Sequence, residues 1–233
     1  MRLTEERFDP REMQMVHAML RREFALAPEV IRTAASGSRD HADIVVQHLN
    51  VITTVLHHHH QAEDDYVWPL LTRRCPDAAT AMVELMEMQH RRLAVLVDAV
   101  NSGLSSWTAC PSAESAAVLA DSVDRLLPVL DDHLDVEEEC VVPLMADYIT
   151  AAEWNAIVAQ GVAEADPGGL LLGFGMLIYE GDRDLVDAAI ANMPEEVRPV
   201  IHEQAEHAFA EHSRRVHGTA TPALSTDLIT NQL

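Results

Sequence analysis

Two segments of the sequence repeat one arrangement of chemical groups. Residues 59–71 read HHQAEDDYVWPLL and residues 133–145 read HLDVEEECVVPLM, so a histidine, a glutamate four residues later and a proline six residues after it recur 74 positions apart. Positions i and i+4 lie on one face of a helix, so each segment aims an imidazole and a carboxylate at the same point. A proline inside a helix costs about 3 kcal/mol and bends the axis. Two such prolines in one register indicate a shared structural device, on two helices whose polar faces converge.

The chain up to residue 148 has the periodicity of helices throughout. Apolar residues recur at spacings of three and four in four stretches, which predicts helices over about residues 10–27, 38–74, 78–103 and 113–148. We expect Pro28 to break or kink the first helix, Pro128 to bend the fourth, and residues 107–112 to form a loop. Four long amphipathic helices with short connections are typical of an antiparallel four-helix bundle.

The last third of the sequence predicts shorter helices packed on this bundle. Thr150 and Glu153 have the spacing of a capping box, which starts a helix. Further helices are expected over about residues 170–179, 185–193 and 194–216. We therefore divide the chain into a bundle of residues 1–149, a C-terminal helical extension of residues 150–217 and a flexible tail of residues 218–233. The predicted fold class is all-α.

Composition excludes several classes of protein. Lys and Arg total 16 against 38 Asp and Glu, and the formal net charge of −22 leaves no basic surface for nucleic acid. The longest mainly apolar stretch, residues 168–179, is too short to span a bilayer, and the charged N-terminus lacks an apolar signal segment. Three scattered cysteines indicate neither a disulfide framework nor a zinc ribbon. We expect a cytoplasmic protein that binds neither membrane nor nucleic acid.

The repeated pairs predict a metal centre in the bundle. A carboxylate buried without compensation costs several kcal/mol, and a bound cation removes that cost. Two glutamates and several histidines are the ligand set of non-haem di-iron or di-manganese sites, with zinc less natural for a bridged pair. The remaining ligands should come from histidines on the apolar faces of the first and third helices. The predicted metal ligands are His17, His59, Glu63, His90, His133 and Glu137.

Alternatives exist for these assignments. Within the run of histidines at residues 57–60, His60 and Asp64 form the same i, i+4 pair shifted by one residue, but the register of the repeat favours His59 with Glu63. Surface ion pairing is the alternative for the two repeated pairs. For the lone histidines of the first and third helices, the alternative is an ordinary core residue.

These residues resemble the hemerythrin-like proteins with the HHE cation-binding domain. The likeness rests on lone histidines in the first and third helices, His-x-x-x-Glu in the second and fourth, and the Glu-Asp and Trp-Pro-Leu elements within residues 63–70, and it covers about residues 10–148. It implies two iron ions bridged by the two glutamates and an oxo or hydroxo group. Oxygen-carrying hemerythrins have a five-histidine set with His-x-x-x-His in the third helix, whereas position 94 here is Ala. Reversible oxygen carriage is therefore not expected. The C-terminal helices resemble those of longer actinobacterial members.

The resemblance implies redox chemistry on a small ligand. One interpretation is an enzyme that reacts with peroxide, O2 or NO; the alternative is a sensor or binding protein for O2, NO or iron without turnover, and a third is a bundle without metal. Tyr66 and Cys140 each follow the repeated glutamate by three residues, so we expect both to face the interior. A phenol there can hydrogen-bond a bound oxygen species or ligate iron, which makes Tyr66 a candidate catalytic residue, with core packing as the alternative reading of both side chains.

Overall fold

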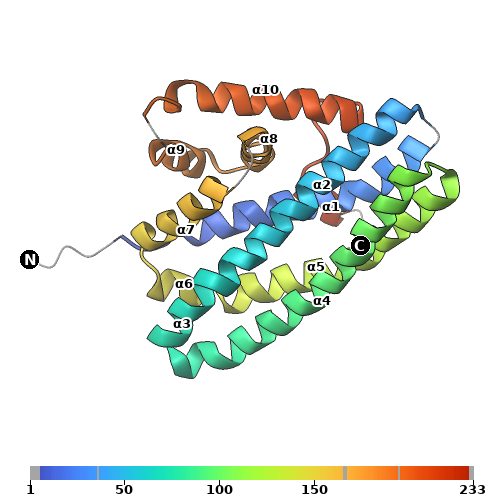
Figure 1. The fold of residues 1–233 in the computed structure, drawn as a ribbon. Helices are drawn as coiled ribbons and strands as arrows, with labels where there is room; N and C mark the ends of the chain where they lie inside the picture. Colours follow the sequence, from blue (N-terminus) through green and yellow to red (C-terminus); the bar gives the residue numbers. More distant parts are fainter. Residues whose placement is uncertain (1–5, 36, 165–166, 194, 231–233) are drawn as a thin grey trace, which may run out of the picture.

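The computed structural model describes residues 6–35, 37–164, 167–193 and 195–230 (Figure 1). Within these ranges the regular elements are helices, and the only β-type pairing is an isolated bridge between Arg7 and Thr150. The predicted all-α fold is confirmed. None of the described helices is long and apolar enough to cross a membrane.

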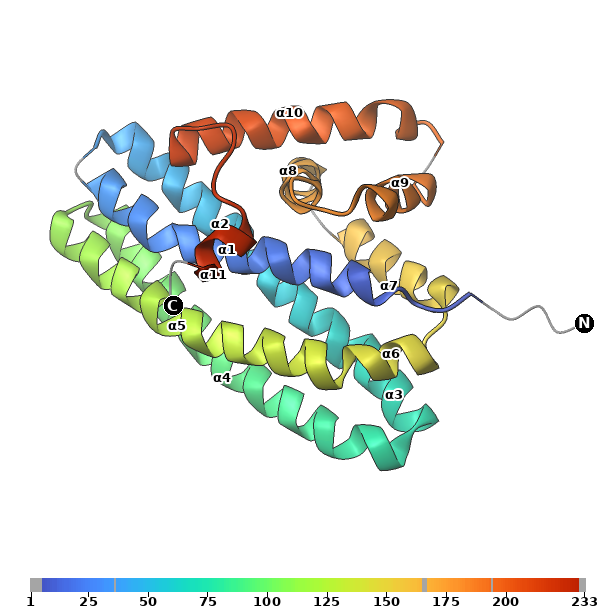
Figure 2. The ribbon, with the colours of Figure 1, turned by 180° about the vertical axis from the view of Figure 1, so that it is seen from behind.

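Four long helices form the bundle seen in Figures 1 and 2. Helix α1 packs along α5, α5 along α4, and α1 against α2. Their apolar faces meet in one core that includes Phe24, Leu49, Leu93 and Leu126, each fully buried. The bounds of the four helices are α1 Pro10–Ala35, α2 Arg39–Ala62, α4 Pro76–Ala109 and α5 Ala113–Cys140.

Two helices extend beyond the ends that the sequence predicts. Helix α1 continues through Pro28, because the turn after the proline buries Val30 and Ile31 in the core. Helix α4 continues past Gly103 to Ala109, so the first half of the loop expected at residues 107–112 is helix. A Cβ atom on Gly103 would lie 3.3 Å from the Cα of Leu119 on α5, so this glycine permits close helix packing rather than ending α4.

The two repeated prolines both begin a new helical segment. After α2, a π-helical turn over Glu63–Val67 is followed by α3, Trp68–Arg74, in which Pro69 is one of the first two residues. After α5, a break at Val141 is followed by α6, Val142–Tyr148, which begins in the same way with Pro143. Proline lacks the N–H that a continuous helix would need, so in each case the regular α-helix is interrupted after the glutamate.

The C-terminal helices lie on one side of the bundle, where α10 packs on α8 and against α2 (Figure 1). Part of the expected tail is also packed. Tyr179 donates a hydrogen bond to the carbonyl of Pro222 at 2.8 Å, and α11, which contacts α1, begins with buried Ser225. This differs from the expected flexible tail, and the division of the chain at residue 150 stays a prediction. The bounds are α7 Ala151–Glu164, α8 Pro167–Ile178, α9 Arg183–Ala191, α10 Arg198–His217 and α11 Ser225–Thr230.

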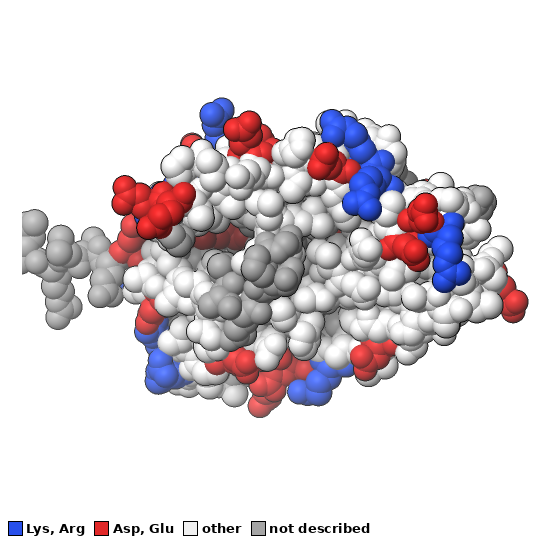
Figure 3. Space-filling model, turned by 45° about the horizontal axis from the view of Figure 1, so that its top comes forward, with Lys and Arg blue, Asp and Glu red and all other residues white. Residues whose placement is uncertain are grey.

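Charged side chains are dispersed over the surface. On the face shown in Figure 3, acidic and basic residues lie in small groups near the edges of the view, several of them side by side. No continuous basic patch is visible on this face, in keeping with the acidic composition.

Candidate metal centre

Seven histidine and glutamate side chains from all four bundle helices and the π-turn converge inside the bundle. Their donor atoms form two groups, and within each group all donors lie within 4.8 Å of one another. Glu63, at the start of the π-turn after α2, belongs to both groups. The first group is His60, Glu63, His90 and His133; the second is His17, His59, Glu63 and Glu137.

The donor atoms are spaced as metal ligands are. Metal–nitrogen and metal–oxygen bonds of about 2.0–2.2 Å place neighbouring ligands of a tetrahedral ion roughly 3.3 Å apart. The nitrogens Nε2 of His17 and His59 face each other at 3.2 Å. The four imidazole–carboxylate distances are 3.4 Å for His17–Glu137, 3.2 Å for His59–Glu63, 3.4 Å for His90–Glu63 and 3.7 Å for His133–Glu137.

Many of these atoms have no hydrogen-bond partner among the described residues. Both carboxylate oxygens of Glu63 and of Glu137 are orphaned in this way, as are ring nitrogens of three of the histidines, His60, His90 and His133. A buried carboxylate without a hydrogen-bond partner destabilises the folded state, because burial removes its hydration and nothing replaces it. The set therefore fits cations placed between the imidazoles and the carboxylates, with Glu63 positioned to bridge two of them.

The outward-facing ring nitrogens of three histidines are held by neighbouring polar side chains. Nδ1 of His17 lies 2.9 Å from Glu138, Nδ1 of His90 lies 2.9 Å from Asp64, and Nδ1 of His133 lies 3.1 Å from the amide oxygen of Gln89. Such partners fix the tautomer so that Nε2 carries the lone pair, and they raise the basicity of the ligand. The sequence analysis did not assign this role, although two of these partners directly follow the predicted ligands Glu63 and Glu137.

Neighbouring carboxylates raise the pKa values of two histidines in the metal-free site. Burial opposes the charged form of His17, but Glu137 and Glu138 outweigh it and raise its pKa to about 9. Asp64 and Glu63 likewise overcome burial at His90 and raise its pKa to about 9. Protons on these two rings thus occupy positions between imidazole and carboxylate that a cation would take in the loaded protein.

The other imidazoles and Glu63 are held neutral. Burial, together with the neighbouring imidazoles, lowers the pKa of His59 to about 3 and the pKa of His60 well below its usual value. Burial and the charge of Glu137 raise the pKa of Glu63. Two carboxylates this close in a dry interior resist simultaneous ionisation unless cations lie between them.

Comparison with known families agrees with this geometry. A family model of the hemerythrin HHE cation-binding domain matches residues 10–145, more than half of the chain. The chain belongs to the hemerythrin HHE family. Comparisons with curated proteins and with solved structures each find no match. The matched residues run from the start of α1 into α6, so they include all seven side chains of the candidate metal centre, which we call the hemerythrin centre.

His60 joins the hemerythrin centre, which differs from the prediction. The repeat favoured His59 over His60, yet the structure places both among the donors, while His57 and His58 are exposed. Adjacent helical residues point about 100° apart, and the inward face of a bundle helix is at least that wide. His59 therefore faces His17 of α1, while the ring of His60 lies 4.2 Å from that of His90 of α4.

The expectation that Tyr66 faces the interior of the hemerythrin domain is wrong. Tyr66 is 40% exposed, whereas Val67 is fully buried. In both repeated segments the residue four positions after the glutamate, Val67 or Val141, is fully buried, because on a helix this residue lies closer to the direction of the glutamate than the third one does. Cys140, in the α-helical counterpart, is half-buried against the apolar cluster around Val141 and Met145. The exposed position of Tyr66 does not support its predicted catalytic role.

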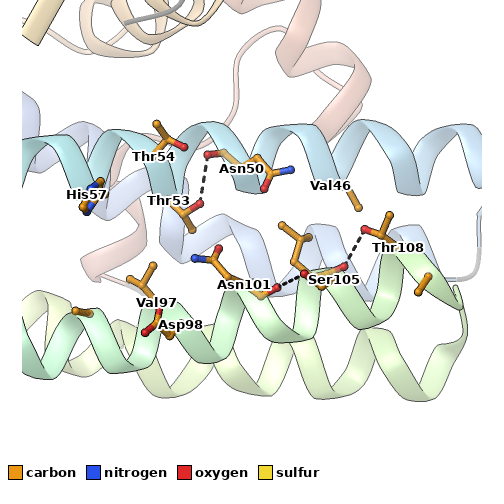
Figure 4. Close-up of a pocket in the computed structure, with 13 residues that line it drawn as sticks. Val46, Asn50, Thr53, Thr54, His57, Val97, Asp98, Asn101, Ser105 and Thr108 are labelled. Carbon is orange, nitrogen blue, oxygen red and sulfur yellow. Dashed lines mark hydrogen bonds between the residues drawn. The ribbon is translucent and has the colours of Figure 1, made fainter. Parts of the chain in front are cut away.

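A groove lies between α2 and α4 of the hemerythrin domain (Figure 4). One end is formed by His57, three residues before His60, and by Ala94, four residues after His90. This end of the groove is thus about one helical turn from two of the metal-ligand candidates. Most labelled side chains of the groove are polar: Asn50, Thr53, Thr54, Asp98, Asn101, Ser105 and Thr108.

Proposed function

We propose that the hemerythrin domain holds two iron ions with an oxo or hydroxo bridge and reacts with peroxide, O2 or NO. The observation that carries the proposal is the pair of four-residue donor groups that share Glu63. A bound iron pair supplies Lewis acidity and a reversible change of oxidation state. With three histidines in one group and two histidines plus Glu137 in the other, each ion has its own imidazoles and a common carboxylate.

The side chains around the donors favour the oxidised state of such a pair. Glu63 and Glu137 contribute two negative charges directly. Asp64 and Glu138 contribute two more through the rings of His90 and His17, against which they lie at 2.9 Å. Anionic ligands stabilise the more highly charged metal, so we expect oxidation by peroxide to proceed more readily than reversible O2 uptake.

The groove between α2 and α4 provides an approach for a small, polar ligand. Its end at His57 and Ala94 is next to the turns that carry His60 and His90. Ala94 occupies the position at which the five-histidine members have their second histidine of the third helix. Here His60 supplies a fifth imidazole from α2, so the small side chain at position 94 leaves that part of the groove open.

The second candidate function is a sensor of the same ligands without turnover. The observation in its favour is that α1 carries His17 of the metal centre and, six residues later, buried Glu23, which faces α10. A change in the position of α1 on ligand binding would thus reach the C-terminal helices. This function shares the iron centre and differs only in the absence of turnover.

Consumption of hydrogen peroxide and of NO by the iron-loaded protein separates the two functions. We expect two iron atoms per chain by elemental analysis and repeated consumption of substrate that Glu63→Ala abolishes. The control is Glu139→Ala, which removes an exposed glutamate two residues from Glu137. Reversible O2 uptake with no consumption of peroxide or NO would replace the enzyme with the sensor. Zinc in place of iron in the bundle's centre, with no iron bound after growth in iron-rich medium, would contradict both.

A further inference from the structure

A second cluster of buried imidazole and carboxylate groups lies outside the bundle's metal centre, where the bundle meets α10. Glu23 comes from α1, His48 from α2 and His217 from the last turn of α10. Oε2 of Glu23 lies 3.5 Å from Nε2 of His48 and 4.0 Å from Nε2 of His217. The three side chains are 1%, 0% and 7% exposed. The consecutive helices α1 and α2 and the distant helix α10 thus bring three donors to one buried point.

The three facing atoms are orphaned. Oε2 of Glu23, Nε2 of His48 and Nε2 of His217 have no hydrogen-bond partner among the described residues. The separations are longer than a hydrogen bond, whose N···O distance is about 2.7–3.2 Å. They are close to the separation of roughly 3.3 Å between two ligands of one tetrahedral zinc ion. The geometry is therefore that of ligands around a common point rather than of a closed ion pair.

The buried charged groups around the cluster carry a net negative charge, which favours binding of a cation. Arg22 donates from Nε and Nη2 to Oε1 of Glu23 at 2.9 and 2.7 Å, and it also pairs with Glu180. One buried arginine thus stands against two buried carboxylates, for a net charge of −1 with neutral imidazoles. Because Arg22 binds Oε1, Oε2 of Glu23 stays directed at the two histidines. The positive charge of Arg22 opposes a cation here, and its pairing with Glu180 reduces that opposition.

Burial favours the neutral form of both imidazoles, and a neighbouring ring contacts His48. Burial, with the neighbouring His212 and Arg22, lowers the pKa of His48 to about 3, and burial with the nearby His48 lowers the pKa of His217 to about 4. Nδ1 of His48 lies 3.1 Å from Nε2 of His212, and in the tautomer in which Nδ1–H of His48 donates to His212 the lone pair of His48 is on Nε2, facing Glu23. A lone pair and a carboxylate oxygen then face each other without a proton between them.

We propose that Glu23, His48 and His217 bind one zinc ion that fastens α10 to α1 and α2. Two imidazoles and one carboxylate form a common three-residue zinc ligand set, which leaves a fourth position for water. The ion would neutralise Glu23 and give each orphaned atom a partner. His217, in the last turn of α10, is the most exposed of the three. The site needs none of the seven donors in the bundle's centre.

Zinc binding to the metal-free full-length chain tests the proposal, with titration calorimetry and elemental analysis as readouts. We expect His217→Gln to bind one zinc per chain fewer than the wild type while its circular dichroism is unchanged. His207→Gln is the matched control, because His207 lies on the same helix and is 72% exposed. His212→Gln removes the residue that orients His48, and we expect an affinity about 10- to 100-fold weaker at this one site.

The same comparison in a bundle variant separates this site from the bundle's centre. Glu63→Gln combined with Glu137→Gln removes both carboxylates of the bundle's centre, and we expect this variant to keep the zinc ion that His217→Gln loses. If the bundle holds no iron, the difference between wild type and His217→Gln still stands. Equal zinc stoichiometry and affinity in the wild type, His217→Gln and Glu23→Gln would overturn the proposal.

Discussion

The ring of His60 stacks on the ring of His90, with centroids 4.2 Å apart and planes inclined by 19°. This contact joins α2 to α4 directly beside Glu63. It places a fifth histidine in the candidate centre from a position that the repeat does not mark. The number of imidazoles in the proposed site is therefore that of the oxygen-carrying members, while the helix that supplies the fifth one differs.

We expect His60→Ala to lower iron binding as much as His59→Ala does. Each variant removes one imidazole from a different donor group, so each should leave one ion incompletely ligated. Elemental analysis of the purified variants measures the loss, with exposed His58→Ala as the control. Full iron content in His60→Ala would show that this ring only packs against His90.

Glu63→Ala and Glu137→Ala should both lose metal, with Glu63→Ala affecting two ions and Glu137→Ala mainly one. Glu63 belongs to both donor groups, whereas Glu137 belongs to the second. Iron per chain is measured after loading under identical conditions. An equal loss of both ions from the two variants would mean that Glu137 also bridges.

Removal of the metal should lower the stability of the bundle. A ligand that binds only the folded chain stabilises it by about 2.7 kcal/mol at a free concentration 100 times its Kd. In the metal-free protein, the buried oxygens of Glu63 and Glu137 have no hydrogen-bond partner among the described residues, and protons on His17 and His90 are a weaker substitute for two divalent or trivalent cations. Thermal unfolding before and after chelation should show a clear decrease in Tm that added iron reverses. An identical Tm would indicate that no metal binds the folded chain in preference to the unfolded one.

Two glycines of α8 should respond oppositely to alanine. A Cβ on Gly175 would lie 2.3 Å from the carbonyl oxygen of Ala205 and 2.9 Å from the Cβ of Phe209, so Gly175→Ala should separate α8 from α10 and destabilise by about 1–3 kcal/mol. Gly173 has no described atom within 4 Å of such a Cβ, so Gly173→Ala should stabilise by up to about 1 kcal/mol. Urea unfolding measures both. Equal effects would contradict the close packing of the two helices.

Acid should weaken the contact between α3 and α7. The hydrogen bond from Arg74, together with the capping contacts of Thr150, lowers the pKa of Glu153 to about 2. A carboxyl whose pKa is lower in the folded state stabilises it above the unfolded value near 4.5, and this contribution disappears as pH falls from there toward 2. Glu153→Gln keeps the capping geometry, so the metal-free variant should be less stable by about 1 kcal/mol at pH 7.

The stability difference between wild type and Glu153→Gln should therefore shrink between pH 5 and pH 3. Denaturant unfolding at several pH values measures it. A difference that does not change with pH would show that the charge of Glu153 contributes nothing and that the hydrogen bonds alone matter.

The helices and the convergence of the two repeated pairs follow from local rules. Periodicity predicts the bundle, and i, i+4 spacing predicts that His59 and Glu63 share a face. The actual helix ends do not follow in this way. Pro28 and Gly103 are local stop signals, but burial of Val30 and Ile31 and the approach of Leu119 to Gly103 outweigh them. Those energies come from contacts between segments distant in sequence.

The sequence by itself determined the family and the bundle, and it predicted six of the seven donors: four from the i, i+4 spacing of the repeated pairs, and two from the places of His17 and His90 on apolar helix faces. Only the tertiary structure decided that His60 joins His59 at the centre. The ring of His59 points toward α1 and the ring of His60 toward α4, and both helices lie on the inner side of α2. It also decided the assembly of Glu23, His48 and His217, which no spacing relates. Ligands that lie on separate helices meet through packing, and packing depends on all the contacts of the core together.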